Sequence, residues 1–347
     1  MEIGSEFWQY DGELLSDNTK FWNIGKDRKF LLSGRTAIYF VLQEILKNQK
    51  VEKVYLPSYS CHSMAQPFLE SNIKVEYYDV AFEDSLKYNI DTEKDCDIFF
   101  AMNYFGYTAT NMEKYIKKFK DRGITVIEDI THSILSEKKY SVYSDYLVGS
   151  LRKWFPIASG GIAVSMKKNF ETQECIETNK NLIISKSTAM SQKKDYIENI
   201  DTSIKQNFLN EFSKSNEILS EDYKNYRIDE NSYKILMGID IEKIQNSRRE
   251  NAKIIYEKLK DIKEIRFLVN NLLNEDCPLF VPIILQENLR NNLRKILIEK
   301  QVYCPIHWPL DKNLNNIFNK ELSLICDQRY TKKEIEEYLK IIVNFFI

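Results

Sequence analysis

The strongest constraint on the fold is an alternation of short apolar runs and amphipathic segments between residues 54 and 165. The apolar runs have the length of buried strands, and the segments between them have the spacing of helices. The expected strands cover residues 54–56, 75–78, 97–101, 125–127 and 162–165, and the expected helices cover residues 62–72 and 112–119. This alternation predicts an α/β fold with a mainly parallel sheet between layers of helices.

Polar, aromatic and acidic residues follow three of these strands, at positions 57–62, 103–106 and 128–133. In open α/β sheets ligands bind at the carboxyl ends of the strands. A single segment of this kind is typical of a loop, whereas three together indicate a binding site.

A second candidate feature is the sequence Ser-Gly-Arg-Thr-Ala at residues 33–37, which precedes an apolar helical pattern. Ser33 is the expected N-cap, and the first turn would present free N–H groups, a hydroxyl and the positive end of the helix dipole. Such a helix start suits a phosphate group. Taken alone, so short a pattern more often marks an ordinary capped helix.

The third feature is Lys153, which follows Ser150 by three residues and precedes two aromatic residues, a proline and the pair Gly160-Gly161. A turn with an exposed lysine and a buried tryptophan is the alternative interpretation. A lysine amine can form a Schiff base with an aldehyde, and pyridoxal phosphate supplies one. Asp129 is the best carboxylate to keep the pyridine nitrogen of such a cofactor protonated.

These motifs together resemble the DegT/DnrJ/EryC1/StrS family, the sugar-nucleotide aminotransferases of aspartate-aminotransferase fold type I. The resemblance extends from about residue 30 to the C-terminus and is weakest over residues 166–224. It rests on residues 33–37, 56–59, 127–132, 150–153 with 160–161, 303–309 and 326–330.

The resemblance implies a role for each matching position. Lys153 would bond to the cofactor, Asp129 would pair with the pyridine nitrogen, and His132 would contact the phenolic oxygen. The phosphate would be held by Gly34, Arg35, Thr36 and Ser150. In a homodimer with a shared active site, Asn225 would reach the site of the partner chain.

One position departs from the family pattern. Cys61 stands where most members have an aromatic residue stacked on the cofactor ring. Tyr59, His62 or Tyr104 could take this place, and the sequence leaves the three open; all three are also candidate substrate contacts. His307 is either a further substrate contact or part of the packing between domains.

The implied function is transfer of an amino group from glutamate to a keto-sugar, carried on a nucleotide, in surface polysaccharide or glycan synthesis. Two alternatives remain open at this stage. The chain could transaminate a small non-sugar ketone or aldehyde, or it could be a catalytically silent protein that keeps the fold and binds a metabolite.

The expected organisation is an N-terminal arm over residues 1–30, a cofactor-binding large domain over 31–235 and a small α+β domain over 236–347. The large domain would hold a sheet of the seven-stranded type, with long charged helices over 166–224. A capping box formed by Thr331 and Glu334 would open the last helix.

Composition excludes several other classes of protein. The net charge of -2, from 49 basic and 51 acidic residues, gives no basic footprint for nucleic acid or an anionic membrane. No apolar run approaches the ~20 residues that span a bilayer. The start of the chain lacks an apolar signal core, and the six cysteines include no C-x-x-C pair. We therefore expect a cytoplasmic protein without a metal site.

Overall fold

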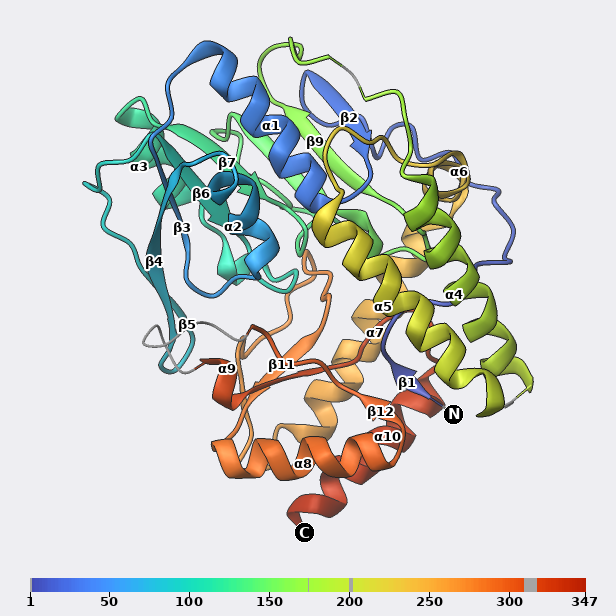
Figure 1. Cartoon of the computed structure of the whole chain (residues 1–347). Helices are drawn as coiled ribbons and strands as arrows, with labels where there is room; N and C mark the ends of the chain where they lie inside the picture. Colours follow the sequence, from blue (N-terminus) through green and yellow to red (C-terminus); the bar gives the residue numbers. More distant parts are fainter. Residues whose placement is uncertain (1, 174, 200–201, 309–316) are drawn as a thin grey trace.

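The centre of the molecule is an eight-stranded sheet in the order β2-β9-β8-β7-β6-β3-β4-β5 (Figure 1). The computed structural model describes residues 2–173, 175–199, 202–308 and 317–347. The strands in sheet order are β2 Asp27–Leu31, β9 Gly161–Ser165, β8 Tyr146–Ser150, β7 Thr125–Asp129, β6 Ile98–Met102, β3 Lys53–Pro57, β4 Lys74–Phe82 and β5 Leu86–Asn89. The five strands from β8 to β4 are parallel, whereas β9, β2 and β5 run antiparallel to their neighbours. The mainly parallel sheet is confirmed, and β5 adds an edge strand beyond the seven expected.

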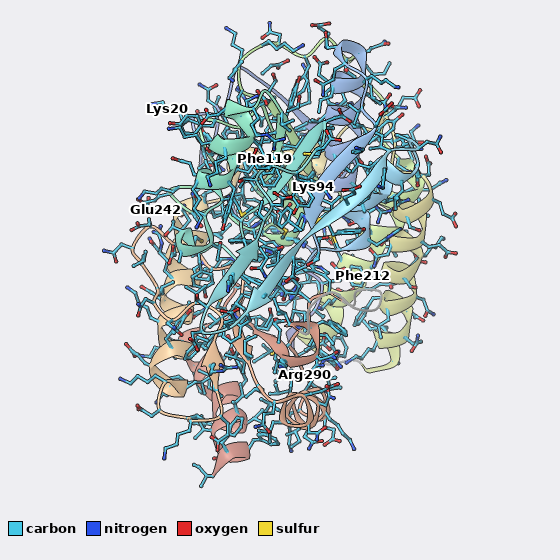
Figure 2. All side chains as sticks on the ribbon, turned by 90° about the vertical axis from the view of Figure 1, so that its left-hand side faces the viewer. Lys20, Lys94, Phe119, Phe212, Glu242 and Arg290 are labelled. Atoms are coloured by element: carbon cyan, nitrogen blue, oxygen red, sulfur yellow. The ribbon has the colours of Figure 1, made fainter. Side chains whose placement is uncertain are left out.

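Three helices pack directly on this sheet. Helix α1 (Gly34–Asn48) lies against β8 and β9, α2 (His62–Leu69) lies beside α1 and β4, and α3 (Glu113–Asp121) contacts β6 and β7. Phe119 of α3 is fully buried and stacks on Phe99 of β6 with ring centroids 4.0 Å apart, whereas Lys20 and Glu242 lie at the surface (Figure 2). The apolar side of each predicted helix therefore forms the core.

A pair of long helices follows the sheet. Helices α4 (Lys180–Asn199) and α5 (Lys205–Glu221) pack along each other and extend beside the N-terminal segment (Figure 1). They are the long charged helices expected within residues 166–224. Helices α6 (Glu230–Gly238) and α7 (Ile241–Leu259) then lead toward the C-terminal part.

The C-terminal part is built around the antiparallel sheet β10-β11-β13. Helix α10 packs on α7 and α8, and its capping box between Thr331 and Glu334 is confirmed. The elements are β10 Arg266–Phe267, β11 Val281–Ile284, α8 Glu287–Glu299, β12 Val302–Tyr303, α9 Ile317–Lys320, β13 Glu321–Leu324 and α10 Lys332–Phe346. Residues 303–309, on which the resemblance rests in part, begin at Tyr303 of β12, and Pro309 lies outside the described residues. A domain boundary near residue 236 stays a prediction.

The N-terminal arm differs from the irregular segment expected over residues 1–30. Strand β1 (Ile3–Gly4) pairs with β12 in parallel, and residues 27–30 belong to β2 of the main sheet. Both strand pairings join residues that are far apart in the sequence, so no local sequence pattern predicts them. None of the described helices is both long and apolar enough to cross a membrane.

The start of α1 lies unusually close to the sheet. A Cβ atom on Gly161 of β9 would stand 2.0 Å from the carbonyl oxygen of Ser33, so only glycine allows this approach. Gly161 pairs with Ser150 across the ladder, and the contact therefore sets the first turn of α1 beside the end of β8.

We expect the Gly161→Ala substitution to lower the free energy of unfolding by about 2–3 kcal/mol, because backbone atoms must move to admit the methyl group. Gly149→Ala on the adjacent strand is the matched control. Its Cβ would meet side-chain carbons of Ile130 and Ile162 at 3.3 Å, whereas the backbone nitrogen of Thr131 would lie at 3.7 Å, an ordinary contact distance. Urea unfolding of both variants measures the difference, and equal losses would contradict the proposed close approach.

Candidate active site

A cavity of about 130 Å³ lies where α1 begins and where β7 and β8 end. Six of the predicted site residues line it: Gly34, Arg35, Cys61, Asp129, Ser150 and Lys153. They come from segments spread over more than a hundred residues of sequence, so the fold gathers them as the strand-end argument predicts. Their chemical roles stay predictions.

The first turn of α1 forms one wall of the cavity. Ser33 is the N-cap, as expected, and its Oγ accepts a hydrogen bond from the N–H of Thr36 at 3.1 Å. A Cβ on Gly34 would lie 3.0 Å from the Cβ of Ser150, so the absence of a side chain brings the helix start against Ser150. Thr36 differs from its expected place: its hydroxyl donates to the carbonyl of Tyr223 at 2.8 Å, and its side chain does not line the cavity.

Two guanidinium groups face the same cavity. Arg35 donates from Nη1 to the carbonyl of Leu219 at 2.9 Å, but its Nε is buried without a hydrogen-bond partner. The Nε of Arg152 is likewise buried and unpaired. Burial lowers the pKa of both side chains, Arg152 also because the Arg35 charge lies nearby. Buried donors without acceptors are costly, and a bound oxyanion would satisfy them.

Asp129 ends strand β7 and is 5% exposed. Its Oδ1 accepts a hydrogen bond from the N–H of Thr131 at 2.7 Å. Burial raises the pKa of Asp129, and the positive charge of Lys153 opposes this effect. The hydroxyl of Thr131 in turn accepts the N–H of Ser150 at 2.9 Å, which ties the ends of β7 and β8 together.

His132 is oriented from both sides. Its Nδ1 accepts a hydrogen bond from the N–H of Phe105 at 3.1 Å, and its Nε2 lies 3.4 Å from Nζ of Lys153. Burial, together with the charges of Lys153 and His307, lowers the pKa of His132 well below its usual range. The ring is therefore neutral, and the hydrogen-bond pattern assigns its proton to Nε2.

Trp308 closes the cavity from the C-terminal part of the chain. Its ring is stacked on His132 with centroids 5.7 Å apart and an interplanar angle of 22°. Nζ of Lys153 lies 5.7 Å from the same ring. Among the described residues that line this cavity, Trp308 carries the one aromatic ring.

The other predicted residues lie outside the cavity. Tyr59 and Tyr104 are buried behind it, with stacked rings 5.4 Å apart, and Tyr104 donates its hydroxyl to the Tyr59 carbonyl at 2.6 Å. His62 is exposed at the start of α2, and Asn225 is exposed with a φ of 60°. His307 lines an adjacent cavity and donates its backbone N–H to Glu321 at 2.7 Å.

Sequence reasoning missed Arg152 and Trp308. The position of Arg152 directly before Lys153 could have drawn attention to it. Trp308 lies within residues 303–309, on which the resemblance rests in part, but no role was assigned to it, because 155 residues separate it from Lys153 and only the packing of the C-terminal part brings it to the site.

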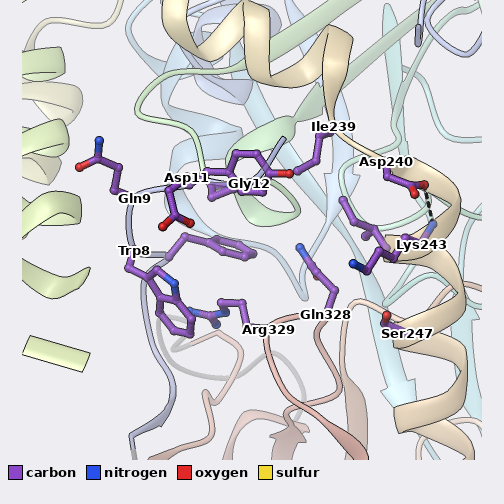
Figure 3. Close-up of a pocket in the computed structure, with 14 residues that line it drawn as sticks. Trp8, Gln9, Asp11, Gly12, Ile239, Asp240, Lys243, Ser247, Gln328 and Arg329 are labelled. Carbon is purple, nitrogen blue, oxygen red and sulfur yellow. Dashed lines mark hydrogen bonds between the residues drawn. The ribbon is translucent and has the colours of Figure 1, made fainter. Parts of the chain in front are cut away.

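A further cavity of about 300 Å³ lies between the N-terminal arm and the start of α7 (Figure 3). Its wall includes Trp8, Asp11, Lys243 and Arg329, but neither Lys153 nor Asp129. The chemistry expected from the sequence therefore belongs to the smaller cavity.

The neutral state of His132 can be measured directly. Because its pKa lies well below the usual range, we expect the ring to keep the Nε2–H tautomer from pH 6 to pH 8, whereas a histidine with a pKa of ~6.5 gains a proton over this interval. Long-range proton–nitrogen NMR of the imidazole, assigned with a His132→Gln variant, reports the tautomer. Protonation of His132 within this range would contradict the assignment.

The chain resembles known proteins in its three-dimensional structure. A scan against protein-family models gives no match, and a search of curated proteins also gives none. A solved structure of PseC from Helicobacter pylori, an aminotransferase involved in the biosynthesis of pseudoaminic acid, is similar with a TM-score of 0.69 at 13% identity, covering 100% of this chain and 99% of that one.

Two further structures are similar over most of the chain. A DegT DnrJ EryC1 StrS aminotransferase from Brucella abortus has a TM-score of 0.61 at 14% identity, covering 93% of this chain and 86% of that one. NtdA from Bacillus subtilis, solved with bound PMP, has a TM-score of 0.62 at 12% identity, covering 98% of this chain and 78% of that one. At such identities the likeness establishes the fold: the chain has the α/β fold of these aminotransferases, as the sequence resemblance predicts.

Proposed function

We propose that the chain is a pyridoxal-phosphate-dependent aminotransferase that moves an amino group from glutamate to a keto-sugar carried on a nucleotide. The observation that supports this most strongly is the content of the 130 Å³ cavity. It brings together a lysine amine, a buried carboxylate and a helix start that carries Arg35, whose Nε is unpaired. This donor and acceptor set fits the cofactor's amine-reactive aldehyde, ring nitrogen and phosphate.

When bound, pyridoxal phosphate supplies an aldehyde for the amine and a ring that accepts electrons. The N–H groups at Gly34 and Arg35, the guanidinium of Arg35 and the hydroxyl of Ser150 would hold its phosphate. Asp129, ionised against a protonated ring nitrogen, would keep the proton there.

Lys153 has two tasks in this proposal. Its amine would hold the cofactor at the aldehyde, and the Nε2–H of His132, 3.4 Å away, can donate to that amine when it is unprotonated. The same amine would carry a proton from one carbon to another as a general base and acid. Trp308 covers the site and excludes water.

The choice of substrates rests on the resemblance and on the activities of structurally similar proteins. PseC acts in the biosynthesis of pseudoaminic acid, which supports a sugar substrate here. A homodimer in the cytoplasm, with Asn225 completing the partner's site, belongs to the same proposal. The exposed, left-handed conformation of Asn225 suits a side chain presented outward.

The first test is covalent attachment. We expect pyridoxal phosphate added to the purified protein to be fixed by borohydride reduction on the peptide that contains Lys153, because this amine lines the cavity. Mass spectrometry of the digested protein locates the label. Lys153→Ala should lose it, whereas Lys139→Ala, which removes another amine whose pKa is lowered by burial, to about 8, should keep it. Labelling that survives Lys153→Ala would overturn the proposal.

The second test addresses the substrate. With glutamate labelled by heavy nitrogen, we expect the label in a nucleotide-linked amino-sugar when keto-sugars are supplied. Transfer to a small ketone or aldehyde alone would favour the non-sugar aminotransferase. A protein that binds the cofactor but transfers no label to either class would support the catalytically silent alternative.

A further inference from the structure

A third cavity, of about 350 Å³, opens on the same lysine from the side of the N-terminal arm. Arg152 and Lys153 line both this cavity and the smaller one. Four basic side chains, Arg152, Lys153, Arg248 and Arg329, and two acidic ones, Glu6 and Asp327, stand in its wall. Resting on the proposed function, we propose that Arg152 is the residue that binds the carboxylate of the amino-acid donor.

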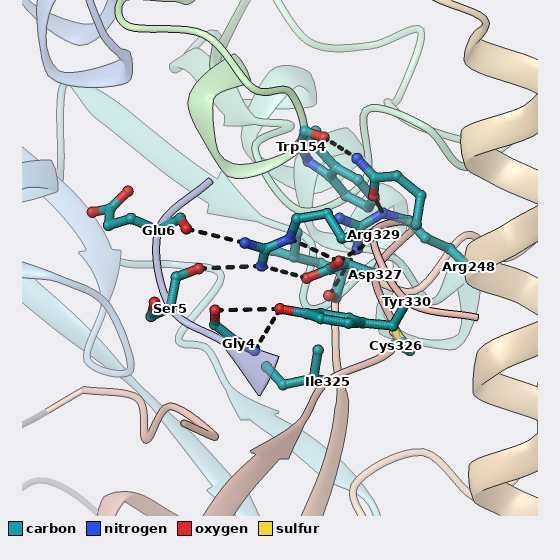
Figure 4. A network of polar contacts seen from close by, with 12 residues as sticks. Gly4, Ser5, Glu6, Trp154, Arg248, Ile325, Cys326, Asp327, Arg329 and Tyr330 are labelled. Carbon is teal, nitrogen blue, oxygen red and sulfur yellow. Dashed lines mark hydrogen bonds and ion pairs between the residues drawn. The ribbon is translucent and has the colours of Figure 1, made fainter. Parts of the chain in front are cut away.

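Arg329 is already fully engaged. It donates from Nε and Nη2 to the carboxylate of Asp327 at 3.0 and 2.7 Å, from Nη1 to the carbonyl of Glu6 at 3.0 Å, and from Nη2 to the carbonyl of Ser5 at 3.2 Å (Figure 4). The guanidinium carbon lies 4.3 Å from the ring centroid of Phe7. Arg329 therefore holds the N-terminal arm in place and offers no free fork to a substrate.

Arg248 is engaged in the same way. Its Nε donates to the side chain of Gln328 at 2.8 Å, its Nη1 donates to the carbonyl of Leu279 at 3.0 Å, and its guanidinium lies over the ring of Trp154 at 4.5 Å. The residue is only 1% exposed. Two of its three nitrogens are therefore already used, and its contact with Trp154 supports the loop of Lys153.

Arg152 has the opposite character. Within the described part of the chain no hydrogen bond or ion pair reaches its guanidinium, and its Nε is buried. The nearest opposite charge is Glu6, whose carboxylate is paired with Nζ of Lys186 at 2.9 Å. Among the described arginines that line this cavity, Arg152 is therefore the one whose guanidinium can still bind a ligand.

The position of Arg152 points to a carboxylate next to the reacting carbon. A planar guanidinium binds a carboxylate through two parallel hydrogen bonds. In a 2-amino acid the carboxylate is one bond from the carbon that carries the amine, so its receptor must stand beside the lysine. In a nucleotide-linked keto-sugar the diphosphate is several bonds from the ketone. The cofactor phosphate is the other possible source of an oxyanion, because Arg152 also lines the smaller cavity.

Calorimetric titration with glutarate, a dicarboxylate without an amine, tests the site in the cofactor-loaded protein. We expect Arg152→Gln to raise the Kd for glutarate by about 10- to 100-fold, and Arg152→Lys to raise it less, because a charge remains without the fork. Arg122→Gln, on α3's side of the molecule and outside this cavity, is the matched control and should leave the Kd unchanged. An unchanged Kd in Arg152→Gln would overturn the proposal.

A Glu6→Gln variant makes the complementary test. Removing the negative charge beside Arg152 should tighten glutarate binding several-fold, while the amide oxygen can still accept from Lys186. Weaker glutarate binding in Glu6→Gln would speak against a free guanidinium beside this carboxylate.

The amount of bound cofactor is measured separately, by its visible absorbance. If Arg152→Gln loses the cofactor while apo wild type and apo variant bind glutarate equally, Arg152 serves the phosphate and the proposal fails. If the wild type binds no cofactor at all, the proposed function fails, and the glutarate titration of that same protein still decides the role of Arg152.

A kinetic test compares two amino donors in the half-reaction. Arg152→Gln should raise the KM for glutamate but not for benzylamine, which has no carboxylate. An equal rise in both KM values would also overturn the proposal.

Discussion

The position of Lys153 depends most on the contacts of the next residue, Trp154. The indole N–H of Trp154 donates to the carbonyl of Thr131 at 2.6 Å, and its own carbonyl accepts from Gln328 at 2.8 Å. Its ring lies under the guanidinium of Arg248. One residue thus joins the end of β7, the lysine loop and the C-terminal part of the chain. A lysine that must reach one carbon atom needs its backbone held by rigid elements, and these contacts supply that support.

Local sequence patterns predicted many of the strands and helix caps. The alternation of apolar runs and amphipathic segments predicted the parallel strands β3, β4, β6 and β7, without a range for β8, and Ser33 and Thr331 were predicted as caps because capping is a matter of a few adjacent residues. Asp129 and Ser150 reach the cavity because each stands at the carboxyl end of a strand, a position that follows from the strand itself. Features of this kind need no knowledge of distant partners.

Other features depend on contacts that no short stretch of sequence contains. Thr36 turns its hydroxyl to Tyr223, 187 residues away, and the helix start presents N–H groups and Arg35 to the cavity instead. Trp308 reaches the site through the packing of a different part of the chain. Tyr59 and Tyr104 look like exposed aromatic candidates in sequence, yet they stack on each other behind the cavity wall. In each case the long-range partner decides the direction of the side chain.

The N-terminal arm is the least predictable part and has the widest consequences. Lys186 and Lys193 of α4 are almost fully buried, and burial lowers the pKa of Lys193 to about 8. A buried ammonium group is tolerated only with partners, and the arm provides them: Glu6 pairs with Lys186, and the Glu6 carbonyl accepts from Lys193 at 2.6 Å. The same short segment is held on its other side by Arg329 of the C-terminal part. Without the arm, Lys186 and Lys193 would lose their acceptors, and Arg329 would keep only Asp327. The arm therefore links the α4–α5 pair to the C-terminal part, and the cavity that joins Glu6, Arg152 and Lys153 exists because the arm is docked.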